Sequence, residues 1–115
     1  MKKRLMPNHG RSLMLFLDDE RHTPQGWVRT YWPDETIEVL KGGDVEVLSL
    51  DHDLGDDERG TGYDVLLWLE EAVKMRGFVP PSVISIHSDN AAVRDKMEAA
   101  IRQIYTYHFE NISRE

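Results

Sequence analysis

Three short apolar runs occur along the chain, and each is followed at once by acidic residues or by histidine. The runs are Leu13 to Leu17, Val45 to Leu50 and Val83 to Ile86. Continuous apolar runs of about 4–8 residues are typical of strands that are buried on both faces of a sheet. We therefore predict one strand in each run.

Between and after these runs, apolar residues recur at helical spacing. The pattern predicts helices over Thr36 to Lys41, over Gly62 to Arg76, and from Asn90 to about Ile104. Gly77 is a typical residue to follow a helix, and Asp89 or Asn90 is a suitable cap for the last helix. Alternating strands and helices predict an α/β domain with a mostly parallel sheet.

Two segments leave the topology open. Asp18 to Gly26 is shorter than the ~10–12 residues that a parallel crossover usually needs. We therefore expect Trp27 to Tyr31 to be either an antiparallel edge strand or extended loop. Tyr105 to Glu115 either extends the last helix or adds a short strand.

Composition narrows the classes of function. The 115 residues include 14 basic and 21 acidic side chains, giving a net charge of -7, which argues against a general binder of duplex DNA. The chain has no cysteine, so disulfides and cysteine-bound zinc are excluded. No apolar run is long enough to span a membrane or to act as a signal peptide. We expect residues 1–12 to be a flexible arm, residues 13–115 to be one domain, and the location to be cytoplasmic.

Four aspartates lie at the ends of the first two predicted strands. Ligands of open α/β sheets bind beyond the carboxyl ends of the strands, so these carboxylates are expected to lie close together. The candidates for a metal site are Asp18, Asp19, Asp51 and Asp53. Neighbouring carboxylates favour a hard divalent cation, and we expect Mg²⁺. The simpler interpretation is that they cap helices and solvate strand ends.

Two histidines also follow strands directly. His52 comes after the second predicted strand and His87 after the third. Histidine is the most common general acid or base, and two of them can act at opposite ends of a phosphoester displacement. A histidine at a strand end can equally be a structural hydrogen-bonding group.

Five other residues are candidates for binding a phosphate. Ser88 and Asn90 lie at the predicted start of the last helix, where backbone N–H groups and the helix dipole favour anions. Arg94 lies one turn further on, Arg21 follows the first acidic pair, and Thr61 precedes the middle helix. Each has a structural alternative, which is helix capping for Ser88, Asn90 and Thr61. For Arg94 it is a solvated helix face, and for Arg21 it is pairing with the acidic residues that precede it.

These motifs resemble the receiver domains of bacterial response regulators. On that resemblance Asp18 and Asp19 match the metal-binding pair, and Asp51 matches the aspartate that accepts a phosphoryl group. Receivers also carry a lysine after their fifth strand, whereas no lysine follows Lys96 in this chain. Ordinary phosphorelay switching is therefore not expected.

A closer resemblance is to the cyclic-phosphate-processing receiver-like domain, over roughly residues 13–104. It is carried by five motifs, which are Phe16 to Arg21, Gly26-Trp27, Ser49 to Gly55, Thr61 to Asp64, and Ile86-His87-Ser88 with Asn90. The resemblance implies a receiver-like (flavodoxin-like) three-layer sandwich with a mostly parallel central sheet and a first helix that is reduced or absent. It also implies action on cyclic phosphates, with catalytic roles for His52, His87 and Asp51.

Together these patterns predict a metal-assisted phosphoesterase of the cyclic phosphodiesterase type. Its substrate would be a phosphate-containing small molecule or an RNA end, and neither duplex DNA nor a membrane is expected as a partner. The alternative is a non-catalytic regulatory module in which the same pocket binds a divalent metal, a phosphate ligand or a partner protein.

Overall fold

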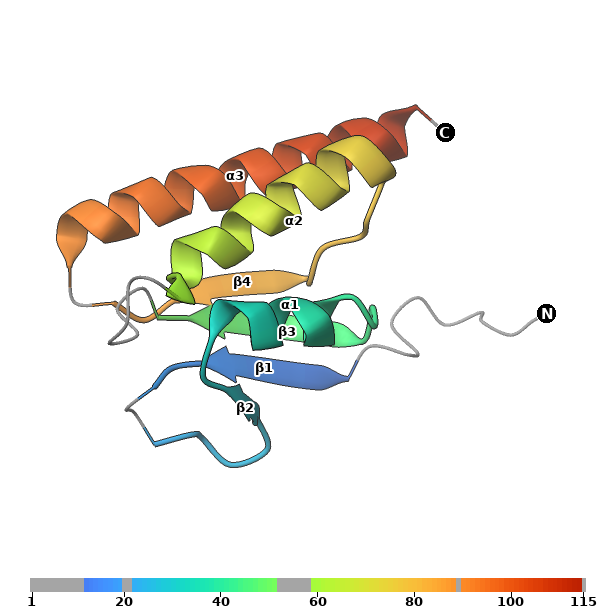
Figure 1. Ribbon diagram of the computed structural model, residues 1–115. Coiled ribbons are helices and arrows are strands. Elements are labelled where there is room, and N and C mark those ends of the chain that lie inside the picture. Colours follow the sequence, from blue (N-terminus) through green and yellow to red (C-terminus); the bar gives the residue numbers. More distant parts are fainter. Residues whose placement is uncertain (1–11, 20–21, 52–58, 89, 115) are drawn as a thin grey trace.

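The computed structural model describes residues 12–19, 22–51, 59–88 and 90–114 (Figure 1). Four strands form one sheet in the order β2-β1-β3-β4, with every neighbouring pair parallel. The strands are β1 (Leu13–Leu17), β2 (Val28–Thr30), β3 (Val45–Leu50) and β4 (Val83–Ile86), and the helices are α1 (Pro33–Leu40), α2 (Gly62–Arg76) and α3 (Ala91–Ser113). The predicted receiver-like α/β fold is confirmed, and β1, β3 and β4 have the predicted bounds.

The second strand corrects the prediction of an antiparallel edge or a loop. β2 runs parallel to β1, with Leu15 opposite Val28 and Leu17 opposite Thr30. The connection is short because it contains no helix in its described part, as expected for a first helix that is absent. Asp18, at the start of this connection, is bonded to β2 at its end. The Asp18 amide donates to the Thr30 carbonyl (3.2 Å), and the Asp18 carbonyl accepts from Arg29 Nε (2.6 Å).

The handedness of the crossovers explains which face of the sheet is covered. Moving from β2 to β3 and from β3 to β4 goes in one direction across the sheet, so right-handed connections place α1 and α2 on the same face. Moving from β1 to β2 goes in the opposite direction, so a helix in that connection would cover the other face. The described residues of that crossover form no helix, only irregular chain with a turn that the Trp27 amide closes on the Pro24 carbonyl (3.2 Å).

The hydrophobic core lies between the three helices and the inward face of the sheet. Leu15, Leu17, Leu48 and Leu50 alternate along the two central strands, and all four are fully buried in this core. Leu40 of α1 and side chains of α2 and α3 complete it. Phe16 and Ser49, which are register partners between these leucines, therefore lie on the opposite face.

The outer elements differ from the predictions in detail. β4 is an edge strand whose Val83 and Ser85 are exposed, so it is not buried on both faces. The tail resolves as helix, because α3 continues to Ser113 and Asn111 Nδ2 donates to the Val73 carbonyl of α2 (2.9 Å). Within the described part of the chain, no helix combines the length and apolarity needed to cross a bilayer.

Candidate metal centre

Three ionisable residues directly follow three neighbouring strands. Asp18 follows β1, Asp51 follows β3 and His87 follows β4. Their amides continue the pairing of the sheet, since Asp51 N donates to the Leu17 carbonyl and His87 N donates to the Leu50 carbonyl, both at 3.0 Å. The backbone of each residue is therefore fixed by the strand beside it.

The side chains of these residues meet at the carboxyl rim of the sheet. One potential ligand atom from each of Asp18, Asp51 and His87 lies within 4.8 Å of the others. The Asp18 side chain is 1% exposed and the His87 side chain is 15% exposed. Two carboxylates and one imidazole at this spacing form a donor set that fits a divalent cation.

His87 is held on three sides. Its Nε2 lies 3.0 Å from Asp18 Oδ2, and its Nδ1 lies 2.7 Å from Ser49 Oγ. The Phe16 ring stacks on the imidazole with 4.5 Å between centroids and 2° between planes. Trp27 in turn packs edge-on against Phe16 at 5.9 Å. Few rotations of the imidazole are compatible with these contacts.

The start of α2 approaches the site closely. Gly62 is the first residue of this helix, and a Cβ at this position would overlap the carbonyl oxygen of Asp51. Thr61 caps the helix, since its Oγ1 accepts from Tyr63 N (3.2 Å) while its own amide donates to Asp64 Oδ2 (2.8 Å). A glycine is therefore required for α2 to begin beside the second carboxylate.

The residues predicted to bind phosphate make structural contacts in the protein. Asn90 caps α3, with its Oδ1 accepting from Val93 N (3.2 Å). Ser88 is buried, and its Oγ accepts from the Asn90 amide (3.3 Å). Arg94 Nη1 donates to the Ser88 carbonyl (3.1 Å), which holds the guanidinium beside the start of its own helix. Binding of a phosphate by these groups stays a prediction.

The structure brings together some of the predicted site residues and not others. Asp18, Asp51 and His87 meet, whereas the half-buried Asp19 is not in the group that could share one ion. Arg21, His52 and Asp53 lie outside the described residues.

Sequence reasoning missed the residues that support His87. Phe16 and Ser49 each lie two positions before a site aspartate, and side chains two apart along a strand share a face. The alternation of side chains along the two strands could therefore have predicted that Phe16 and Ser49 face the site. Arg29, which binds the Asp18 carbonyl and donates to Thr23 Oγ1 (2.7 Å), had no such signal.

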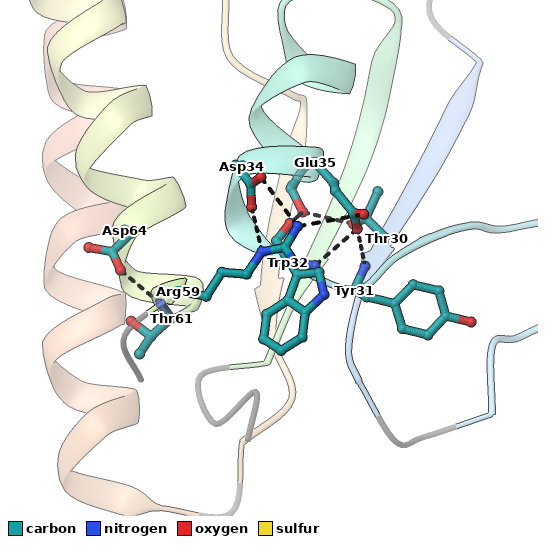
Figure 2. Close-up of polar contacts among 9 residues, drawn as sticks. Thr30, Tyr31, Trp32, Asp34, Glu35, Arg59, Thr61 and Asp64 are labelled. Atoms are coloured by element: carbon teal, nitrogen blue, oxygen red, sulfur yellow. Dashed lines mark hydrogen bonds and ion pairs between the residues drawn. The ribbon is translucent and has the colours of Figure 1, made fainter. Parts of the chain in front are cut away.

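A second charged cluster lies at the start of α1, on the surface (Figure 2). Arg59 contacts Asp34 (3.4 Å) and Glu35 (4.0 Å), and its guanidinium lies 4.6 Å from the centre of the Trp32 ring. The hydrogen bond from Arg59 lowers the pKa of Asp34 below its ordinary value. Glu35 also accepts from the amides of Tyr31 (2.9 Å) and Trp32 (3.2 Å), which fixes the start of the helix.

A parallel α/β sheet with carboxylates and histidine at its carboxyl rim defines a receiver-like domain. The family model described as the cyclic-phosphate processing receiver domain matches residues 13–103, and the chain belongs to this family. No curated protein and no solved structure matches the chain significantly.

Proposed function

We propose that this protein is a metal-assisted phosphoesterase that opens cyclic phosphates of nucleotides or RNA ends. The observation that supports the proposal best is the meeting of Asp18, Asp51 and His87 at one rim of the sheet. Family membership supports the substrate class, because the family is described as processing cyclic phosphates.

The donor set determines how the site would work. Asp18 and Asp51 would hold a divalent cation, and we expect Mg²⁺ because both ligands are carboxylates. A bound cation offsets phosphate charge and lowers the pKa of a coordinated water. The amino end of α3, with Asn90 and Arg94 beside it, would face the phosphate oxygens. His52 and His87 are the residues predicted to move protons.

Incubation with 2′,3′-cyclic nucleotides tests this proposal. We expect ³¹P NMR to show conversion to a phosphomonoester in the presence of Mg²⁺ and none in the presence of EDTA. Asp51→Asn should abolish turnover because it removes a charged ligand, and His52→Ala should do so because it removes the predicted proton donor or acceptor. Asp95→Asn, at an exposed position on α3, is the matched control and should leave turnover unchanged.

One observation favours the non-catalytic alternative. Both ring nitrogens of His87 have partners within the protein, so proton exchange with a substrate would require breaking one of these hydrogen bonds. In a regulatory module the same assay would show saturable binding of the cyclic nucleotide or of Mg²⁺, with no product. That outcome would reject the proposed hydrolysis.

A further inference from the structure

The four strands end in register, so the residues that directly follow them lie in one row across the sheet. Thr30 and Leu50 are both register partners of Leu17. Leu50 is in turn the partner of Ile86. The next row, in the order β2-β1-β3-β4, consists of Tyr31, Asp18, Asp51 and His87. Three of these residues form the candidate metal centre, and Tyr31 is the fourth member of the row.

Tyr31 follows β2 beside the first carboxylate of this centre. The Asp18 amide donates to the carbonyl of Thr30 (3.2 Å), which is the residue just before Tyr31. Neighbouring strands of a sheet are about 4.8 Å apart, so the backbone of Tyr31 lies about one strand spacing from that of Asp18. An aromatic side chain is therefore available next to the carboxylates.

The Tyr31 ring is exposed and yet held in place. The Arg29 guanidinium lies 4.6 Å from the centre of the ring, and it is itself fixed by hydrogen bonds to the Asp18 carbonyl (2.6 Å) and to Thr23 Oγ1 (2.7 Å). The Tyr31 amide donates to Glu35 Oε1 (2.9 Å). Tyr31 is nevertheless 49% exposed, and Figure 2 shows its ring pointing away from the charged cluster at the start of α1. A ring that is held in this way loses little conformational freedom when a ligand stacks on it.

We propose that Tyr31 binds the base of a nucleoside cyclic phosphate by stacking, so that the site selects nucleotides over cyclic phosphates that lack a base. This inference rests on the proposed function and deepens it by naming the substrate class. With the phosphate at the carboxylates, the ribose spans the step from β1 to β2 and brings the base to the ring. Every base has a π-face, so stacking accepts different bases, and it typically changes affinity by about 5- to 150-fold per base.

The test compares two phosphomonoesters that have no cyclic bond to open. The first is 3′-AMP, and the second is methyl ribofuranoside 3-phosphate, in which a methyl group replaces the base. Titration calorimetry of the full chain with Mg²⁺ should show that the wild type binds 3′-AMP about 10-fold more tightly. Tyr31→Leu should lower the affinity for 3′-AMP by about 10-fold and leave that for the methyl riboside unchanged. Tyr31→Phe should retain wild-type affinity because it keeps the ring.

Tyr107→Leu is the matched control. The Lys74 amine lies 5.3 Å from the centre of the Tyr107 ring, so this tyrosine also carries a cation on one face. It lies in the last third of α3, beside the last turn of α2, and both helices begin at the rim that holds the site and run away from it (Figure 1). Its replacement should leave both affinities unchanged.

A wild-type protein that does not bind 3′-AMP, or that binds both esters equally, would overturn the proposal. Equal affinity of wild type and Tyr31→Leu for 3′-AMP would do the same. Nuclear Overhauser effects between the adenine protons and the Tyr31 ring are expected in the wild-type complex, and their absence would count against stacking even if Tyr31→Leu failed to fold.

The failure of this inference can be separated from failure of the proposed function. Binding of 3′-AMP that depends on Tyr31, without hydrolysis of cyclic nucleotides, would reject the hydrolysis and leave the stacking intact. If hydrolysis occurs, Tyr31→Leu should raise KM by about 10-fold at unchanged kcat, because the stack is present equally in the ground state and the transition state. Hydrolysis with an unchanged KM would reject the stacking alone.

Discussion

Two charged clusters of similar make-up lie in opposite surroundings in this protein. At the candidate metal centre His87 is 15% exposed and lies 3.0 Å from Asp18, with Phe16 stacked beneath the imidazole. At the start of α1 the Arg59 side chain is 44% exposed and lies 3.4 Å from Asp34, with Trp32 beneath the guanidinium. In each cluster a carboxylate lies beside an imidazole or a guanidinium that is stacked on an aromatic ring. The two clusters differ in how deeply they are buried.

Burial determines how strictly each cluster is defined. A buried donor or acceptor that loses its partner has no water to replace it, so the cost of disruption is large. An exposed ion pair exchanges its partner for water and is screened by salt, so many geometries have nearly equal energy. Function that depends on fixed atoms is therefore expected at the buried cluster.

The largest effect is expected from a substitution that disturbs the close approach of α2 to the Asp51 backbone. Gly62→Ala should destabilise the protein by about 3 kcal/mol, because the new methyl group overlaps the Asp51 carbonyl and α2 must move away. Urea unfolding measures the loss, and Mg²⁺ binding should weaken with it. Gly42→Ala, at the end of α1, is the control, since its methyl group would lie 3.3 Å from the Val39 carbonyl. A loss of stability as small as that of the control would show that the approach of α2 is not tight.

A smaller effect is expected from the aromatic support of His87. Phe16→Leu keeps most of the buried apolar volume but removes the ring stack, which should reduce the free energy of unfolding by about 1 kcal/mol. Broadened ¹⁵N resonances of the His87 ring should accompany this loss. If the spectrum and the unfolding midpoint were unchanged, the stack would not hold the imidazole, and the contrast with Trp32 would weaken.

The exposed cluster should tolerate the loss of its cation. Arg59→Gln removes both ion pairs and the contact with Trp32, yet we expect a change of at most about 0.5–1 kcal/mol. The difference between variant and wild type should shrink further in ~1 M NaCl, because salt screens exposed charges. A loss as large as that of Gly62→Ala would contradict the distinction between the two clusters.

The smallest effect is the titration of Asp34. Its pKa is lowered by the hydrogen bond from Arg59, so the folded state binds a proton less readily than the unfolded state does. Any stabilisation is therefore present above the ordinary value of 3.8 and is lost as the pH falls through the lowered pKa. Carboxyl ¹³C NMR should show the pKa of Asp34 return towards 3.8 in Arg59→Gln. An unchanged titration curve would mean that Arg59 is not the cause.

Much of the architecture was predictable because its signals are local. The apolar runs defined β1, β3 and β4, and the glycines at positions 62 and 77 bracketed α2 at its observed bounds. The parallel direction of β2 was not predicted, because the contact of Arg29 with the Asp18 carbonyl beside this strand forms only on folding. The exposure of β4 was missed for a similar reason, since an edge position is a property of the whole sheet.

The candidate site was also predicted only in part from the sequence. Polar residues at the ends of three apolar runs identified Asp18, Asp51 and His87, because parallel strands bring their carboxyl ends to one rim. The ring contacts of His87 depend on which residues are neighbours across strands, so Ser49 was not recognised as its partner. Asp19 was included because adjacency in sequence suggested a pair, although successive residues of an extended chain point to opposite sides.

The register between β1 and β3 determines whether the two site aspartates come together when the chain folds. Leu17 lies opposite Leu50, and the next rung carries the two aspartates. If one strand slipped by a single residue, every side chain of that strand would exchange faces, burying a carboxylate among leucines and exposing a leucine to water. The same alternation that forms the core therefore also favours the correct alignment of the candidate metal ligands, because each misplaced residue adds to the free-energy cost of a slipped register.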